Sequence, residues 1–137
     1  MRVSDAANVL GVTPSTIRIY DNRSLAVLPR DENGYRVLNN RELRRIADMR
    51  GFMLAQRLNL NSLVALSAMI PCWNIMACSK ERRAVCRRGS DGEHPCWHYH
   101  RDTGGCLDVP CSECTVYLNM VDHIRELRRL YLPAVRC

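Results

Sequence analysis

The chain has 137 residues, which is enough for one domain or for two small ones. Hydrophobic residues make up 47% of the sequence, which excludes a wholly disordered chain. The 20 Lys and Arg outnumber the 14 Asp and Glu, giving a formal net charge of +6 that favours a polyanionic partner. Lys80 is the single lysine, so nearly all of this charge is arginine, whose planar guanidinium suits phosphate and guanine.

The sequence contains neither an N-terminal signal segment nor an apolar run approaching the ~20 residues needed to cross a bilayer. The longest apolar patch, residues 63–70, is interrupted by Ser67. We therefore expect a cytoplasmic protein without membrane contact. In a reducing compartment, clustered cysteines more often bind metal or do redox work than form structural disulfides.

Residues 1–38 predict two short helices followed by a hairpin. Ser4 is a good N-cap for the first helix, and Gly11 is expected to end it. Thr13 can cap the second helix, and Pro14 suits its first position. Two helices joined by a tight turn that contains glycine form a helix-turn-helix, whose second helix enters the major groove of DNA.

A wing is expected directly after the second helix. Asn33-Gly34 is the strongest short hairpin signal in the chain, and it lies between expected strands at Leu28 and at residues 35–38. A further helix is expected to start near residues 40–42. On it, Arg41, Arg44 and Arg45 fit a phosphate grip and a solvated helix face equally well.

These spaced motifs resemble the MerR family of transcriptional regulators. The similarity covers roughly residues 1–70 and is carried by Ile17-Arg18-Ile19-Tyr20-Asp21, Leu25, Pro29-Arg30, Gly34-Tyr35-Arg36, Asn39, Leu43, Ile46 and Leu58-Asn59-Leu60-Asn61. The chain departs from the family pattern at Asp21, where the family usually has Glu, and at Ser24-Leu25, where it usually has Gly-Leu.

The resemblance implies a homodimer that binds a two-fold-related promoter, distorts the double-stranded DNA and lets RNA polymerase use it. Thr16 and Arg18 would face DNA from the recognition helix, while Tyr35 and Arg36 would contact the backbone from the wing. Tyr20 would either pack in the core or touch phosphate. The expected DNA-binding residues are Thr13, Ser15, Thr16, Arg18, Tyr20, Arg30, Tyr35 and Arg36.

Seven of the eight cysteines fall in one central segment. They are Cys72, Cys78, Cys86, Cys96, Cys106, Cys111 and Cys114. Glycines and prolines interrupt the segment, and its aliphatic content is too low for a core of its own. The cysteines therefore predict a metal centre that holds the segment together.

The cysteine spacing is compatible with several centres. The run Cys106-x4-Cys111-x2-Cys114 resembles the pattern that plant-type ferredoxins use for an iron–sulfur cluster. The pair Cys111-x2-Cys114 alone is equally typical of half a zinc knuckle. The repeated Pro-Cys-Trp at residues 71–73 and 95–97 resembles the two-CW cysteine module of bacterial sensory proteins, over about residues 71–117.

An iron–sulfur cluster is the preferred cofactor, because MerR-type relatives that sense oxidants carry one. Structural zinc, a sensed thiophilic metal, and disulfides or free thiols stay open, since thiolates suit several soft metals. His94, His98 and His100 are interpreted as a surface loop rather than as ligands. Cys137 is interpreted as a free terminal thiol.

From Thr115 to Leu132 the apolar residues recur at helical spacing, and Pro133 ends the pattern. This helix is the candidate for dimerisation, because the family resemblance implies a coiled coil between subunits. The alternative is that it folds back on its own winged domain.

The sequence therefore predicts a mainly α protein with three parts. Residues 1–70 form a winged helix-turn-helix, residues 71–114 an irregular cysteine-rich module, and residues 115–137 a dimerisation helix. We expect a non-enzymatic DNA-binding regulator controlled by the cysteine centre. Alternatives are a zinc-stabilised or metal-responsive regulator, an excisionase-like architectural protein, a redox enzyme or electron carrier, or a zinc-stabilised adaptor for another protein.

Overall fold

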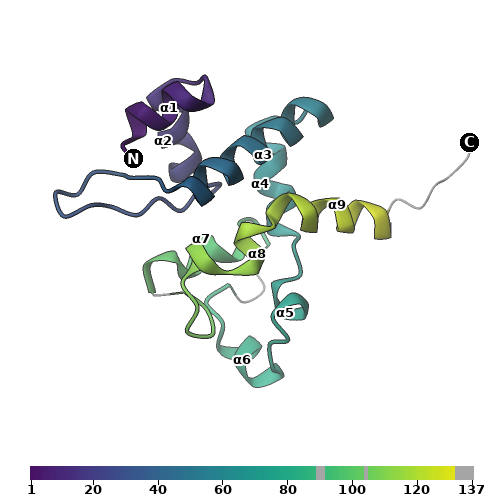
Figure 1. Ribbon diagram of the computed structural model, residues 1–137. Coiled ribbons are helices and arrows are strands. Elements are labelled where there is room, and N and C mark those ends of the chain that lie inside the picture. The colour runs from purple at the N-terminus through teal and green to yellow at the C-terminus, as the bar shows by residue number, and fades with distance from the viewer. Residues whose placement is uncertain (89–91, 104, 132–137) are drawn as a thin grey trace, which may run out of the picture. The chain divides into compact units, whose positions relative to one another are not determined.

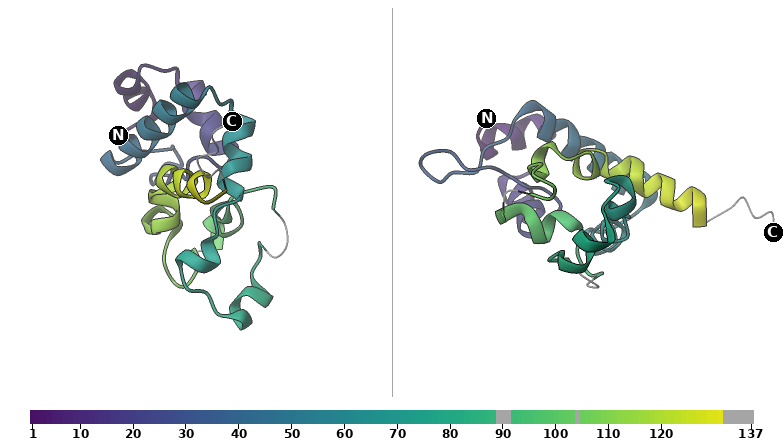
Figure 2. Two further views of the ribbon diagram at one scale, coloured as in Figure 1. Left: turned by 90° about the vertical axis from the view of Figure 1, so that its right-hand side faces the viewer. Right: turned by 90° about the horizontal axis from the view of Figure 1, so that it is seen from below.

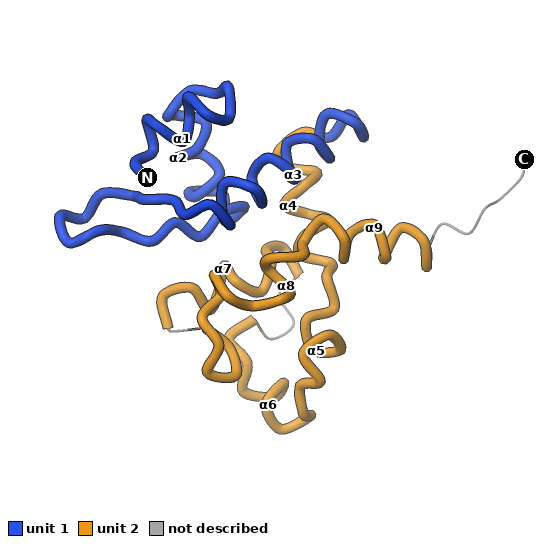
Figure 3. Tube along the Cα trace, in the orientation of Figure 1, with its two compact units in different colours: residues 1–58 blue, residues 59–137 orange. Residues whose placement is uncertain are grey.

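A computed structural model describes residues 1–88, 92–103 and 105–131 of the chain (Figure 1). The chain divides into two compact units, Met1–Leu58 and Asn59–Cys137 (Figure 3). This division falls ahead of residue 70, where the sequence places the end of the first part. Within the second unit, helix α4 (Leu60–Ala68) packs against helix α9 (Met120–Tyr131).

The helix-turn-helix in the first unit has the predicted boundaries. Helix α1 (Val3–Leu10) ends at Gly11, which adopts the left-handed conformation with a φ of 67°. Helix α2 (Pro14–Asn22) begins with Pro14 and is capped by the Thr13 hydroxyl, which accepts a hydrogen bond from the Thr16 backbone N–H. Helix α1 itself starts after Arg2 without a side-chain cap, so the expected Ser4 cap is wrong.

The wing forms, but its turn is not the two-residue type I′ turn that is typical of Asn-Gly, in which both residues have a positive φ. Only Gly34 has a positive φ (82°), and its N–H bonds the Asp31 carbonyl in a turn that ends with this glycine. The Asp31 carboxylate also accepts the N–H groups of Asn33 and Tyr35. In place of the expected strands, the described residues contain only isolated β-bridges, such as that between Arg30 and Arg36. The resulting loop projects from the helices of its unit (Figure 2).

Helix α3 (Asn40–Gln56) follows the wing and is capped by Asn39, whose side chain accepts the Glu42 N–H. Arg45, on this helix, is buried and donates to the Leu25 carbonyl at 2.5 Å and to Glu42 at 3.4 Å. Arg45 is therefore a core residue, which corrects both of its expected roles. Ser24 occupies the usual glycine position with a φ of 58°. The buried apolar residues of the unit are Val3, Ala6, Ala7, Ile17, Tyr20, Leu25, Ala26, Leu28, Leu38, Ile46, Met49 and Phe52.

The second unit consists of short helices joined by irregular segments. After α4 come α5 (Cys72–Ile75), α6 (Lys80–Val85), α7 (Cys96–His100), η1 (Arg101–Thr103), η2 (Cys111–Glu113), α8 (Thr115–Leu118) and α9. The sequence predicts one continuous C-terminal helix, but the helix is interrupted at Asn119. This residue has a non-helical ψ of 30° and separates α8 from α9. Pro133 and Cys137 lie outside the described residues.

The second unit does have an apolar core, which the sequence does not lead us to expect. Trp97, the largest side chain in it, is 1% exposed and meets the Tyr117 ring edge-on at 5.2 Å between centroids. Val116, Met120 and Ile124 are also buried there. The start of the C-terminal helical segment therefore packs within its own unit and does not stand free.

Asp21 holds the start of the wing to the end of α2. Its nearly buried carboxylate accepts the Leu28 N–H at 3.3 Å and the Arg36 Nε–H at 2.6 Å. Asp21→Ala should lower the free energy of unfolding by about 2–4 kcal/mol, because it leaves a buried donor and a partly buried guanidinium without their acceptor. Urea unfolding measures this loss. Asp48→Ala, an exposed carboxylate on α3, is the control, and an equal loss in both variants would contradict the role of Asp21.

Candidate functional site

The first candidate site is the exposed side of helix α2. Of the expected DNA-binding residues on this helix and its cap, Thr13, Ser15 and Arg18 are exposed, and Thr16 is half-buried. Tyr20 is only 4% exposed and belongs to the core, so the packing role is the one the structure shows. In the described part of the chain, Arg18 has no hydrogen-bond or ion-pair partner, which leaves its guanidinium available to a ligand.

Helix α2 and the wing together form a basic hollow of about 210 Å³. Arg18 reaches it from α2, while Arg30, Tyr35 and Arg36 reach it from the wing. The structure thus brings together four of the eight expected DNA-binding residues. Arginine guanidinium groups around a hollow suit phosphate oxygens, which supply much of the affinity in protein–DNA contacts.

Arg2, which is not among the residues predicted from the sequence, also lines this hollow. Its guanidinium lies 4.4 Å from the centroid of the Tyr35 ring and 3.6 Å from the Asp31 carboxylate. Both partners belong to the wing, so Arg2 fixes the wing against the start of α1. No local motif marks Arg2, because its partners lie about thirty positions further along the chain and meet it only in the fold.

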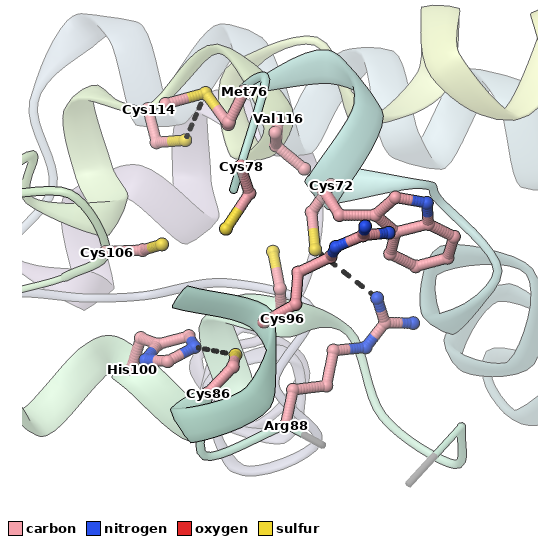
Figure 4. Close-up of a pocket in the computed structure, with 12 residues that line it drawn as sticks. Cys72, Met76, Cys78, Cys86, Arg88, Cys96, His100, Cys106, Cys114 and Val116 are labelled. Atoms are coloured by element: carbon pink, nitrogen blue, oxygen red, sulfur yellow. Dashed lines mark hydrogen bonds between the residues drawn. The ribbon is translucent and has the colours of Figure 1, made fainter. Parts of the chain in front are cut away.

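The second candidate site is a cavity of about 290 Å³ inside the second unit. Six of the seven cysteines that the structure describes line it, and Figure 4 shows them around it. They are Cys72, Cys78, Cys86, Cys96, Cys106 and Cys114. His100, Met76, Trp73, Val116, Arg83 and Arg88 complete the lining. No carboxylate lines the cavity among the described residues, so its donor atoms are soft ones.

Cys72 and Cys96 share a hydrogen bond at this cavity. The thiol of Cys96 donates to the sulfur of Cys72, and the Arg88 guanidinium lies 3.3 Å from the same sulfur. These two neighbours lower the pKa of Cys72 to about 6, although burial acts in the opposite direction. The same bond raises the pKa of Cys96 well above its usual value. Cys72 is therefore the cysteine best prepared to act as a thiolate ligand or nucleophile.

Two further sulfur contacts lie around the cavity. Cys86 Sγ is 3.4 Å from His100 Nε2, and the Cys114 thiol lies 3.9 Å from the Met76 sulfur. Burial and the charge of Arg87 lower the pKa of His100, which favours the neutral imidazole that binds metals. The interpretation of His100 as a surface-loop residue is thus wrong. His94 and His98 instead stack on each other at 4.1 Å and do not line the cavity.

Cys106 is held at the cavity by a tight turn. It forms a β-bridge with Val109, and Leu107 and Asp108 between them both have positive φ values. Gly105, with a φ of 95°, precedes the turn, and a Cβ at this position would collide with the Val109 carbonyl. The turn that positions Cys106 therefore requires glycine at position 105.

Cys111 is the one described cysteine that does not line the cavity. It is buried behind the lining residues, and burial together with the neighbouring thiols Cys114 and Cys106 raises its pKa to about 11. The geometry therefore does not support Cys106, Cys111 and Cys114 as one ferredoxin-like ligand run. The spacing of the cysteines distinguishes Cys111 from the other six. The pattern Cys-Trp-x4-Cys-x7-Cys starts at residue 72, and the similar pattern Cys-Trp-x8-Cys-x7-Cys starts at residue 96. Cys111 belongs to neither repeat.

The cavity cysteines surround a common space without yet meeting at ligand distance. Among the described residues, no group of three or more His, Cys, Asp or Glu side chains is arranged so that it could hold a metal ion as it stands. A shared centre would therefore require the thiols to rotate into the cavity.

The comparison with protein families concerns the first site. Residues 1–63 match the family of MerR HTH family regulatory proteins. The N-terminal region is a MerR-type DNA-binding domain. No curated protein and no solved structure matches the chain significantly. The family match covers less than half of the chain, and the residues that line the basic hollow all lie within it.

In the described ranges, no helix combines the length and the apolar character that a bilayer crossing requires.

Arg18→Ala should weaken binding of the MerR-type domain to duplex DNA without unfolding it, because Arg18 is exposed and forms no hydrogen bond or ion pair in the described chain. If Arg18 contacts a phosphate, the slope of log K against log salt should fall by about 1. Fluorescence anisotropy with a duplex of arbitrary sequence measures both quantities. Arg125→Ala, an equal loss of charge at an exposed position of the second unit, should leave affinity nearly unchanged. Equal affinities of wild type and Arg18→Ala would contradict the interface.

Proposed function

We propose that the chain is a dimeric, cytoplasmic transcriptional regulator of the MerR type whose promoter activity is controlled by a cysteine-ligated centre. The centre is an iron–sulfur cluster that responds to redox state. Its partners are promoter DNA, RNA polymerase and a second copy of the chain. The observation that supports this proposal most strongly is the convergence of six cysteines on one cavity in the second unit.

The residues around the cavity fit such a centre chemically. Thiols, one imidazole and one thioether are soft donors, which suit zinc, copper(I) and iron–sulfur clusters better than magnesium or calcium. A cluster held by four thiolates needs four of the six cysteines, and the side chains must turn inward to reach it. Trp73, Met76 and Val116 make part of the lining apolar.

The surplus of thiols favours a cluster over a single zinc ion. A structural zinc site is closed by four ligands, and six cysteines with two internal repeats exceed that number. The contact between Cys86 and His100 supports zinc as the second candidate, because mixed cysteine and histidine ligands are common for zinc. When bound, an iron–sulfur cluster supplies a one-electron redox change.

The chain connects this cavity directly to the helices on either side of it. Cys72 starts α5, shortly after α4 ends at Ala68, and Cys114 immediately precedes α8. A change in the positions of these two cysteines would therefore act on the ends of α4 and α8. In this proposal, such movement alters the dimer and hence the spacing of its two recognition helices.

The proposed dimer uses the second half of α9. Met120 and Ile124 are buried within the unit, whereas Leu130 is 68% exposed and Leu127 is half-buried. An apolar residue exposed near the end of an amphipathic helix is a reasonable contact for a second helix.

The centre is tested by purifying the chain anaerobically and measuring its visible absorption and its content of iron, sulfide and zinc. A brown protein with iron and labile sulfide is expected. Cys111→Ser should retain the centre, because Cys111 does not line the cavity, whereas Cys96→Ser should lose most of it.

Two results would count against this centre. A colourless protein with stoichiometric zinc would make the module a structural zinc site and remove the redox role. Equal loss of metal in Cys111→Ser and Cys96→Ser would contradict the assignment of ligands to the cavity.

Leu130→Ser should weaken the dimer, because it removes an exposed apolar side chain from the proposed interface. Analytical ultracentrifugation over a range of concentrations measures the dissociation constant. Glu126→Ser is the matched control on the same helix, since its exposed pair with Arg129 contributes little to stability. A monomeric wild type, or a dimer unaffected by Leu130→Ser, would refute this interface.

A further inference from the structure

Arg88 is a buried cation beside the cysteine cavity. Its side chain lines the cavity and the residue is only 8% exposed, although a guanidinium stays charged at every physiological pH. Burying a charge is costly unless opposite charge and hydrogen bonds compensate for it. Among the described residues, no Asp or Glu forms an ion pair with Arg88, and its contacts there are with other groups.

The contacts of Arg88 lie on two sides of its guanidinium. Nη1 donates to Cys72 Sγ at 3.3 Å, and Nη2 donates to the carbonyl of Ala68. The guanidinium also lies 5.3 Å from the centroid of the Trp73 ring. Its Nε is buried without a hydrogen-bond acceptor in the described structure (Figure 4 shows the side chain at the cavity).

Both hydrogen-bonding sides favour positive charge. Ala68 is the last residue of α4, and the final carbonyls of a helix lack partners within the helix and carry partial negative charge. On the other side, a neutral thiol is a weak acceptor, whereas a thiolate carries the full charge that a buried guanidinium requires. The position of Arg88 therefore indicates negative charge on the cavity side.

We propose that Arg88 is the counter-cation of an anionic thiolate–metal centre in the cavity and the positioning residue that links this centre to the end of α4. This inference rests on the proposed function, because it requires a metal centre held by the cavity cysteines. A centre with four thiolate ligands is negatively charged, and reduction by one electron from an external donor adds one more negative charge beside Arg88. The guanidinium thus stabilises the reduced state more than the oxidised state.

The chain offers a matched control for this role. Arg83 also lines the cavity and carries the same charge, but it is exposed and forms no hydrogen bond with a thiol in the described structure. Arg83→Gln and Arg88→Gln therefore remove equal charge from the same cavity wall. Arg88→Lys keeps the charge but lacks the planar fork that contacts Cys72 and Ala68 together.

The test begins with the iron, sulfide and zinc content of wild type, Arg88→Gln, Arg88→Lys and Arg83→Gln after anaerobic purification. For samples that hold a cluster, dithionite titration with redox mediators gives the reduction potential. Arg88→Gln should shift the potential to more negative values, and Arg83→Gln should shift it much less. Arg88→Lys should stay close to wild type. If Arg88→Gln does not fold, Arg88→Met replaces it with an apolar side chain.

The outcomes separate this inference from the proposed function. A wild-type cluster with equal potentials in Arg88→Gln and Arg83→Gln overturns the role of Arg88 and leaves the cluster in place. An equal shift in Arg88→Lys and Arg88→Gln also overturns it, because charge is then not the cause. If wild type holds zinc, the cluster is refuted, and faster zinc release to a chelator from Arg88→Gln than from Arg83→Gln supports Arg88. A wild type that binds no metal refutes both.

Discussion

The second unit holds a buried positive charge, that of Arg88, beside its thiols, and the arrangement of the unit depends on how this charge is compensated. Arg88 lies against Cys72 on one side and against the end of α4 on the other, while Cys96 donates its proton towards Cys72. These contacts connect the first cysteine of each Cys-Trp repeat to the helix that begins the unit. A purely apolar filling of this space would leave the guanidinium with only the Ala68 carbonyl and the Trp73 ring, so the cavity and its cysteines form one electrostatic arrangement.

The first unit solves a related problem with a carboxylate. Asp21, at the end of α2, accepts hydrogen bonds from Leu28 and Arg36 and so fixes the wing next to the recognition helix. The family pattern usually has the longer Glu at this position. Here the shorter Asp still reaches the wing, because Arg36 extends to meet it at 2.6 Å. The Asp21 carboxylate compensates the charge of Arg36. Arg18 and Arg30, which also line the basic hollow, have no such carboxylate partner among the described residues.

The sequence predicts the first unit well where the determining contacts are local. Thr13, Pro14, Gly11 and Asn33-Gly34 act within a few residues of their own positions, so helix ends and the wing can be located from spacing. It predicts less where partners are distant. The burial of Arg45 against Leu25, twenty positions away, gives a charged core residue that no helical periodicity distinguishes from a solvated arginine.

The cysteine segment shows the same limit in a different form. Its cysteine count predicts a shared centre, and the cavity brings six of those thiols together, yet the local Cys-x2-Cys spacing includes Cys111, which does not line the cavity. A Cys-x2-Cys pair specifies a ligand geometry only if the intervening turn exposes both thiols to the same space. Here Cys111 begins a short 3-10 helix and is buried, while Cys114 directly after that helix lines the cavity. The longer repeat of seven residues between cysteines is more informative, because it relates equivalent positions in two similar halves. Tertiary equivalence, rather than short spacing, therefore determines which thiols line the same cavity.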